Sequence, residues 1–472
     1  MARLFCQGAQ QLMLRLPVHK TAFFIALVVW LGGMPPHAAF AQQRITLSIE
    51  GSRAYGIRAL TQKRPDVAQA IALGLLQRDP NDVQALLMLC AAQTAQGQGD
   101  QAVVTGKRAL THAKNPTERF SAIRMIAAAK ANSGHYTQAE LWLRRALQAA
   151  PNERLRAITQ RDFKLVKRKN PLKLDLIFSI NPSSNINNGA SNEIAWLFDR
   201  PFILSSDAQA LSGIEYTAGV RARYRISQTA TKATDLGVLL YSKSYSLSER
   251  SKRLAPGASA SGYAFQAAEV SVSHLTLRNQ GTTMLSYQAT LGQNWYGGDP
   301  LNRYIRFDIS QKHRVSPALS HRFAASAEYQ TRIGVKNYDL TTFSASGTLN
   351  FRLKDSGKLS LSLEGRNASG GNRSGEFAGV KFAMGYAFDT PLLGTDVSID
   401  MSAERRDFPY SPFTTNGRQD NRLTAGVSLL FSKADVYGFS PTLDFRAVKT
   451  QSSIDLYDTD SFTVGVGFRS TF

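Results

Sequence analysis

Apolar and polar residues alternate one by one along most of the chain after Asn170-Pro171. Such a period of two predicts β-strands with one apolar face. Strands of soluble proteins are usually about 5–6 residues long, whereas strands that cross a membrane need about 9–11. The segments here are long enough to span, so we expect a barrel with a lipid-facing outer surface and a wet interior. The clearest segment has apolar residues at Ile214, Tyr216, Ala218, Val220, Ala222, Tyr224 and Ile226.

Fourteen segments of this kind are expected, an even number as in bacterial single-chain barrels. They are Leu172–Ile180, Leu211–Ile226, Asp235–Ser246, Gly262–Leu277, Thr282–Asn294, Arg303–Val315, Leu319–Val335, Leu340–Leu353, Lys358–Ala368, Phe377–Asp389, Leu393–Asp407, Asn421–Lys433, Gly438–Gln451 and Ser461–Phe472. The predicted fold class is therefore α+β with two domains. A tetratricopeptide-like helical solenoid at residues 62–169 precedes a 14-stranded antiparallel transmembrane barrel at residues 170–472.

The connections between these segments alternate between short and long, with one exception at the fourth of the long set. Outer-membrane barrels have short periplasmic turns and longer surface loops. We therefore expect both ends of the barrel sequence, and the helical region joined to its first strand, to lie in the periplasm of a Gram-negative cell.

The last predicted strand carries apolar residues at Phe462, Val464, Val466 and Phe468, and the sequence ends at Phe472. A terminal aromatic residue on such a strand resembles the recognition signal of the barrel assembly machinery, so Phe468 and Phe472 are its candidate residues. Aromatic side chains also suit the girdle at a membrane interface.

The region before the barrel is rich in Ala, Leu, Gln and Arg, with apolar residues at helical spacing. Three small residues, Gly97, Ala102 and Ala109, recur 37 positions later as Gly134, Ala139 and Ala146. This pattern resembles the tetratricopeptide repeat, whose period is about 34 residues. Small residues let helix pairs nest and stack into a groove. Such a groove suits capture of a protein partner, and a rigid spacer for the barrel is the alternative.

The N-terminus has the pattern of a signal peptide over residues 1–41. Basic residues precede an apolar stretch from Thr21 to Gly33, and the small residues Ala39 and Ala41 mark a cleavage site before Gln42. Residues 42–61 then form a lead segment. Only Cys90 of the two cysteines would remain after cleavage, so no internal disulfide is expected.

The chain is basic, with 56 Lys and Arg against 35 Asp and Glu and a formal charge of +21. This charge suits nucleic acid, an anionic membrane surface or an acidic substrate, and export excludes nucleic acid. In a second long loop, Arg250, Lys252 and Arg253 suit either lipopolysaccharide phosphates or a solvated surface.

Catalysis has little support in the sequence. Neither HExxH nor GxSxG occurs, and the only candidate pair is Ser273-His274. We expect a protein that is not an enzyme and that uses no cofactor or metal.

The polar positions of the predicted strands place charges in the barrel interior. A basic row of Arg221, Arg223 and Arg225 comes from the second segment. An acidic side of the interior comprises Glu364, Asp396, Asp400 and Glu404. The basic row and the acidic side would either order water and polar chain segments between them or form structural ion pairs.

A signal peptide, a short repeat module and a 14-stranded barrel in one chain resemble the surface lipoprotein assembly modulator family of the type XI secretion route. Residues after the first strand resemble the family pattern there, and this entry motif comprises Asn181, Pro182, Asn185, Ile186, Asn187 and Ala190. The resemblance implies transfer of lipoproteins, or in some branches soluble proteins, to the cell surface. It also implies substrates with a small C-terminal β-barrel domain. With this function, the repeats would dock the substrate or a periplasmic chaperone.

The segment between the first two predicted strands is long for a structureless connection. We expect it either to fold into the barrel as a plug or gate, or to lie over the mouth as a surface loop. Two other functions stay open, a polysaccharide export porin and a passive porin, both with a periplasmic helical domain. The sequence does not identify the cargo.

Overall fold

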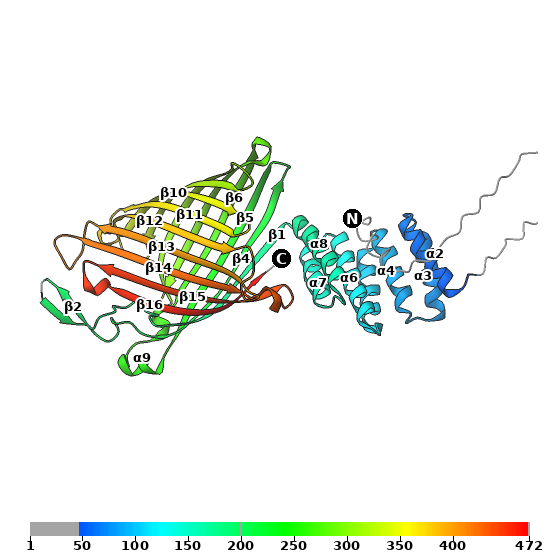
Figure 1. The fold of residues 1–472 in the computed structure, drawn as a ribbon, viewed down its shortest axis with the longest axis horizontal. Coiled ribbons are helices and arrows are strands. Elements are labelled where there is room, and N and C mark those ends of the chain that lie inside the picture. The colour runs from blue at the N-terminus through cyan, green and yellow to red at the C-terminus, as the bar shows by residue number, and fades with distance from the viewer. Residues whose placement is uncertain (1–46, 199, 471–472) are drawn as a thin grey trace, which may run out of the picture. The chain divides into compact units, whose positions relative to one another are not determined.

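The computed structural model describes residues 47–198 and 200–470, which form two compact units. We call residues 47–170 the helical unit and residues 171–470 the barrel unit (Figure 1). The change from one to the other falls at Asn170-Pro171, where the composition of the sequence changes. The predicted cleavage residues Ala39 and Ala41 and the terminal Phe472 lie outside the described residues.

The helical unit contains seven helices among its described residues, and each packs on the next along the chain. Side chains of Asp82 and Asn115 accept hydrogen bonds from backbone N–H groups that the first turns of their helices leave unpaired. The helices are α2 (Ile49–Thr61), α3 (Pro65–Arg78), α4 (Val83–Ala95), α5 (Gly99–His112), α6 (Pro116–Asn132), α7 (Tyr136–Gln148) and α8 (Glu153–Lys169).

The repeated small residues occupy equivalent places in this unit. Gly97 and Gly134 follow α4 and α6 with φ angles of +78° and +79°, a left-handed conformation that glycine adopts without strain. The four repeated alanines, on α5 and α7, are fully buried: Ala102, Ala109, Ala139 and Ala146. A tetratricopeptide-like character of the stack stays a prediction.

Helix α2 lies within residues 42–61, which the sequence predicts to be a lead segment outside the helical region. Its sequence has few large apolar residues and two glycines, Gly51 and Gly56, which weakens the helical pattern. The helix is held by tertiary contacts instead, because buried Ala59 packs with Ala68 and Met88 of the next two helices.

The barrel unit is a closed antiparallel barrel of fourteen strands, which confirms the predicted fold class. The order around the barrel is that of the chain, and β1 closes the ring against β16. The strands are β1 (Leu172–Ser183), β4 (Gly213–Gln228), β5 (Lys232–Leu247), β6 (Phe265–Arg278), β7 (Thr283–Tyr296), β8 (Asp299–Arg314), β9 (Leu319–Arg332), β10 (Asp339–Leu353), β11 (Gly357–Ser369), β12 (Phe377–Phe388), β13 (Asp396–Phe408), β14 (Arg418–Leu430), β15 (Phe439–Ser452) and β16 (Thr459–Ser470).

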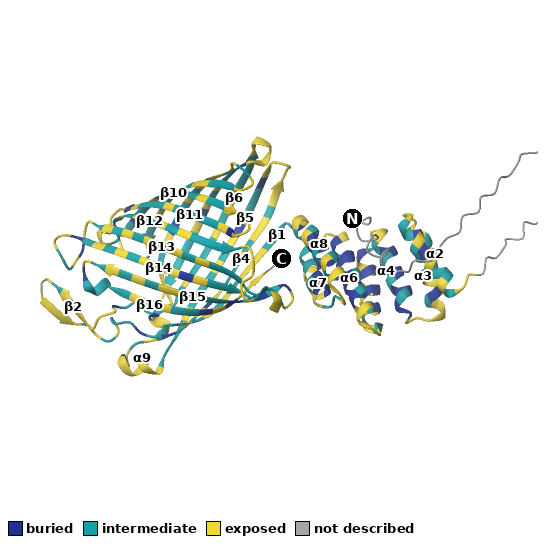
Figure 2. Ribbon diagram, in the orientation of Figure 1, coloured by how far each residue is buried: buried dark blue, intermediate teal, exposed yellow. Residues whose placement is uncertain are grey.

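Large apolar side chains are exposed on the outer face of the strands, as Leu176 on β1 and Phe468 on β16 illustrate. Figure 2 shows buried residues concentrated in the helical unit, while exposed and intermediate residues alternate along the barrel strands. A protein in water would not leave so much apolar surface uncovered. No helix in the described part of the chain combines the length and the apolar character needed to cross a bilayer.

Four of the connections between strands differ clearly from the prediction. A short hairpin of β2 (Ile194–Leu197) and β3 (Arg200–Ile203) lies within the long segment after β1. Only Gly297 and Gly298 separate β7 from β8, where a longer loop was expected. The strands extend this far because the end of β7 pairs with the start of β8 beyond a register shift between Asn294 and Trp295. The turns at 389–395 and 431–438 are longer than predicted. We call the end of the barrel that carries these two turns the turn end, and the opposite end the loop end.

Candidate functional site

The basic row of β4 faces the barrel interior, since Tyr224, which lies between two of its members, and Ile226, which follows the last, are exposed on the outer face. Arg225 forms an ion pair with Asp235 of the neighbouring strand, with Nη2 3.1 Å from Oδ2. Arg223 lies 3.9 Å from Asp175 of β1, and both side chains are half-exposed. Arg221 has no ion pair with any residue that the structure describes, although it is the register partner of Asp175 on β1.

The predicted acidic side also carries arginines. Glu404 is nearly buried and accepts hydrogen bonds from Arg366 and Arg406, the second at 2.7 Å. Arg366 also lies 3.1 Å from Glu364, and Arg446 of β15 lies 3.5 Å from Asp400. Asp396 is the first residue of β13, at the turn end. The interior on this side is therefore a network of ion pairs within the wall.

Two further polar clusters of the barrel interior lie around Arg306 and Glu215. Arg306 on β8 lies within 3.4 Å of carboxylate oxygens of Glu269, Asp308 and Glu328. Glu215 on β4 accepts hydrogen bonds from Lys243 at 3.0 Å and from Asn181 at 3.0 Å. Alternation places each of these residues on the polar face of its strand, and that signal was available for all of them.

The entry motif begins inside β1, because this strand extends to Ser183 and includes Asn181 and Pro182. Asn187 then donates to the carbonyl oxygens of Asp207 and Gln209 and accepts from the amide of Leu211. These hydrogen bonds connect the start of the long loop after β1 to the segment that leads back to β4. We call this set of contacts the clasp.

The other motif residues strengthen the same clasp. Asn185 both donates to the carbonyl and accepts from the amide of Gly189. Ile186 and Ala190 are buried, and both of their amides pair with the returning segment. The clasp explains the Asn-rich composition, since these side chains satisfy an irregular backbone.

The hairpin of β2 and β3 lies at the loop end rather than in the barrel interior (Figure 1). It is anchored to the loop between β15 and β16, where the amide of Trp196 donates to Asp455 and the amide of Ser191 to the carbonyl of Asp458. Burial, together with the carboxylates of neighbouring acids, raises the pKa of Asp458. The hairpin exposes apolar side chains, with Trp196 57%, Phe198 64% and Ile203 80% accessible. This position corresponds to the surface-loop alternative.

Among the described residues, the seam between β1 and β16 is paired over a shorter stretch than other neighbouring strands. Its register partners are Ser179 with Gly467, Ile180 with Val466, and Ser183 with Thr463. By contrast, β15 and β16 pair from Phe439 with Ser470 to Thr450 with Thr459. Toward the loop end the seam is completed by Ser184, whose amide donates to the carbonyl of Phe462 at 3.0 Å.

The remaining candidate residues from the sequence lie on strand β6 and on a short helix that precedes it. Ser273 and His274 are consecutive residues of β6 and so point to opposite faces of the sheet. They do not form a Ser–His pair. Arg250, Lys252 and Arg253 lie on the short exposed helix α9 (Glu249–Leu254), with Lys252 paired to Glu249 at 2.7 Å. No group of three or more potential metal-binding side chains occurs within residues 47–198 and 200–470.

A closed antiparallel barrel with an apolar outer face and a charged interior defines a β-barrel protein of the outer membrane. Residues 173–472 match the surface lipoprotein assembly modifier family, and the chain belongs to that family. No curated protein matches the chain significantly.

Solved structures of outer-membrane channels match part of this chain at low sequence identity and low TM-score. A BenF-like porin from Pseudomonas fluorescens Pf-5 has 7% identity and a TM-score of 0.36, covering 63% of this chain and 98% of that one. An anion-selective porin from Comamonas acidovorans has 12% identity and a TM-score of 0.32, covering 64% and 100%. An outer membrane channel from Pseudomonas putida F1 has 7% identity and a TM-score of 0.33, covering 62% and 93%.

Proposed function

We propose that this protein is an outer-membrane translocon that moves surface lipoproteins from the periplasm to the cell surface, as the outer-membrane component of a type XI route. The observation that carries the proposal is the family match over residues 173–472, which covers nearly the whole barrel unit. Soluble secreted proteins are a second class of cargo for the same route.

The barrel interior supports a path for polypeptide. Its walls carry paired charges rather than an apolar lining, as the clusters around Arg306 and Glu404 show. A chain in transit can therefore exchange hydrogen bonds with the wall and with water. Transfer would be driven by folding or binding of the cargo on the far side, and the protein would act without catalysis or cofactor.

The helical unit would lie in the periplasm and dock the cargo or its chaperone. The turn end of the barrel carries most of the shorter connections, which face the periplasm in outer-membrane barrels. Strand β1 begins at this end, at Leu172, so the chain would enter the barrel from the periplasmic side. The barrel assembly machinery would insert the protein, with Phe468 and Phe472 in its signal, and outer-membrane lipids and lipopolysaccharide would surround it.

The proposal is tested by co-expressing the chain, in a Gram-negative host that lacks it, with a lipoprotein encoded by a neighbouring gene. Antibody labelling of intact cells should detect the lipoprotein only when the chain is present, while total lipoprotein stays constant. Equal labelling with and without the chain would contradict the proposal, as would the appearance of a polysaccharide at the surface instead.

A further inference from the structure

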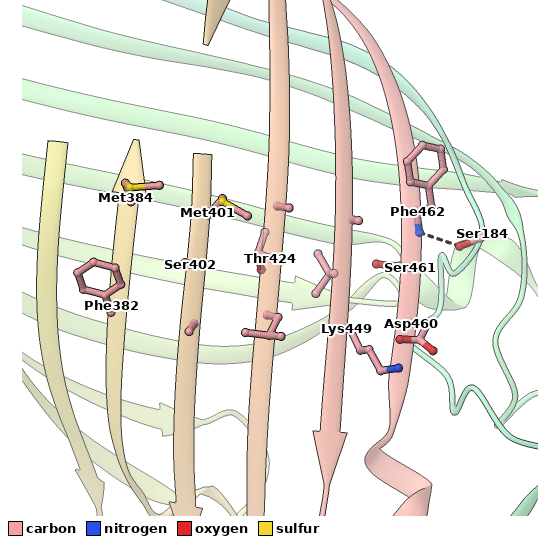
Figure 3. A pocket seen from close by; sticks show the side chains of 15 residues that line it. Ser184, Phe382, Met384, Met401, Ser402, Thr424, Lys449, Asp460, Ser461 and Phe462 are labelled. Atoms are coloured by element: carbon pink, nitrogen blue, oxygen red, sulfur yellow. Dashed lines mark hydrogen bonds between the residues drawn. The ribbon is translucent and has the colours of Figure 1, made fainter. Parts of the chain in front are cut away.

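The outer face of the barrel is hollowed across strands β12 to β16 (Figure 3). The hollow has a volume of about 660 Å³, within the range of roughly 300–1,000 Å³ that small-molecule sites occupy. Its lining is apolar except at one end. The larger lipid-facing side chains around it are Phe382, Met384, Met401, Leu423 and Phe462.

Three alanines form the floor of the hollow. Ala425 of β14 is the register partner of Ala447 of β15, and Ala403 lies on the adjacent strand β13. Ala425 and Ala447 belong to a row of register partners that runs across the strands. In this row they are flanked by Met401 of β13 on one side and by Phe462 of β16 on the other. Small side chains between large ones therefore leave an elongated space that runs across the strands.

An apolar hollow in this position would be filled by a hydrocarbon chain, because the outer face of the barrel meets lipid. Bulk lipid is as apolar as the lining, so selectivity has to come from shape and from a polar end. The two methionines supply adaptable walls, since their side chains are flexible.

The polar end of the hollow consists of Lys449 and Asp460, which are register partners on β15 and β16 toward the loop end. Figure 3 shows both side chains at one end of the hollow. Together they provide an ammonium donor and a carboxylate acceptor with no net charge. This combination suits a neutral head group that has both carbonyl oxygens and an N–H group, whereas the phosphates of lipid A would face the like charge of Asp460.

The hollow also adjoins the seam of the barrel. Ser184 and Phe462 line it, and the amide of Phe462 donates to Oγ of Ser184 at 2.9 Å across the seam. A lipid held there is next to the stretch of wall where β1 and β16 pair over few positions.

We infer that this hollow binds an acyl chain of a lipoprotein, with Lys449 and Asp460 contacting the ester and amide groups of its acylated N-terminal cysteine. The identity of the ligand as a lipoprotein rests on the proposed function. The site places the lipid anchor against the outside of the barrel, beside the seam and away from the charged interior.

The test uses the full-length protein in phospholipid nanodiscs and a synthetic triacylated lipopeptide with a photoreactive group on one acyl chain. Ala425→Phe fills the floor of the hollow and should remove most of the crosslinking. Ala325→Phe is the matched control, because Ala325 is an exposed alanine on the outer face of β9, and it should crosslink like the unaltered protein. Heat-modifiable gel migration verifies that both variants are folded barrels.

A second variant tests the polar end. Asp460→Asn with Lys449→Gln keeps the size of both side chains and should weaken lipopeptide crosslinking several-fold. Equal crosslinking of the unaltered protein and Ala425→Phe would overturn the inference, and so would displacement of the lipopeptide by lipid A or phosphatidylethanolamine. If the lipopeptide labels the hollow but cells without the protein keep their surface lipoproteins, the proposed function fails while the lipid site stands.

Discussion

Asn187 holds the long loop after β1 through backbone hydrogen bonds, and its replacement is the most local test of the clasp. Asn187→Ala leaves the backbone groups of Asp207, Gln209 and Leu211 without this partner, at a cost of about 1–3 kcal/mol for groups that stay buried. We expect limited proteolysis of the folded protein to cut residues 184–212 faster. Asn192→Ala in the same loop is the control, and equal cleavage of both variants would contradict the clasp.

Asp82 gives the helical unit a pH dependence with a defined sign. Burial alone would raise the pKa of Asp82, but hydrogen bonds from Arg53 and from the amides that it caps outweigh burial and lower the pKa below 3.8. Because the pKa of Asp82 is lowered in the folded protein, the contribution of this carboxylate to stability is present above pH 3.8 and is lost as the pH falls through the folded-state pKa.

The comparison variant is Asp82→Asn, which can still cap α4 but does not titrate. Thermal melts followed by the helical circular dichroism signal should show a larger loss for the original protein than for Asp82→Asn between about pH 5 and pH 3. Parallel losses in the two proteins would exclude this role.

At the level of single residues, alternation alone was sufficient to place the charges in the barrel interior. It could not supply their partners, because these depend on which strands are neighbours and in which register. Glu404 was selected as part of an acidic side, whereas Arg366 lies two strands away and completes its pairing. The floor of the outer hollow was missed for a related reason, since alanines on three strands become a surface feature only when the register aligns them.

The strands were predictable because lipid on one side and water on the other impose a strict period of two over more than nine residues. All fourteen predicted segments correspond to barrel strands. Elements outside this constraint were not predictable in the same way. The exposed hairpin of β2 and β3 is short and lacks alternation, and α2 depends on packing against α3 and α4.

Two glycines of the helical unit should respond in opposite directions to the same substitution. Gly134 has a φ angle of +79°, so Gly134→Ala forces a left-handed conformation that costs roughly 1–2 kcal/mol. Gly74 lies within α3 with open space where a Cβ would go, so Gly74→Ala should stabilise the helix by about 0.5–1 kcal/mol.

The measurement is the midpoint of helical unfolding in the full-length protein. We expect a lower midpoint for Gly134→Ala and a higher one for Gly74→Ala. A shift of both variants in the same direction would contradict the described turn after α6.

On the scale of the whole molecule, substitutions in the basic row can distinguish a role in cargo transport from a role in assembly of the barrel. Arg225 is paired with Asp235, so its loss would leave a carboxylate uncompensated. Arg221 and Arg223 have little or no pairing in the structure. Combined Arg221→Gln and Arg223→Gln should therefore reduce surface display of cargo several-fold while heat-modifiable migration stays unchanged.

The control for the basic row is Arg405→Gln, which removes an exposed arginine from the outer face of β13 and should leave display unchanged. Full display in the doubly substituted protein would show that the row has no part in transport.

The most direct test of the whole account is protease treatment of intact cells with and without the gene, followed by proteomics of the released and retained proteins. The account predicts that deletion removes one or a few lipoproteins from the released fraction while the same proteins accumulate inside, and that the intact gene restores them. An unchanged set of surface lipoproteins, in cells where the barrel is normally folded in the outer membrane, would contradict it.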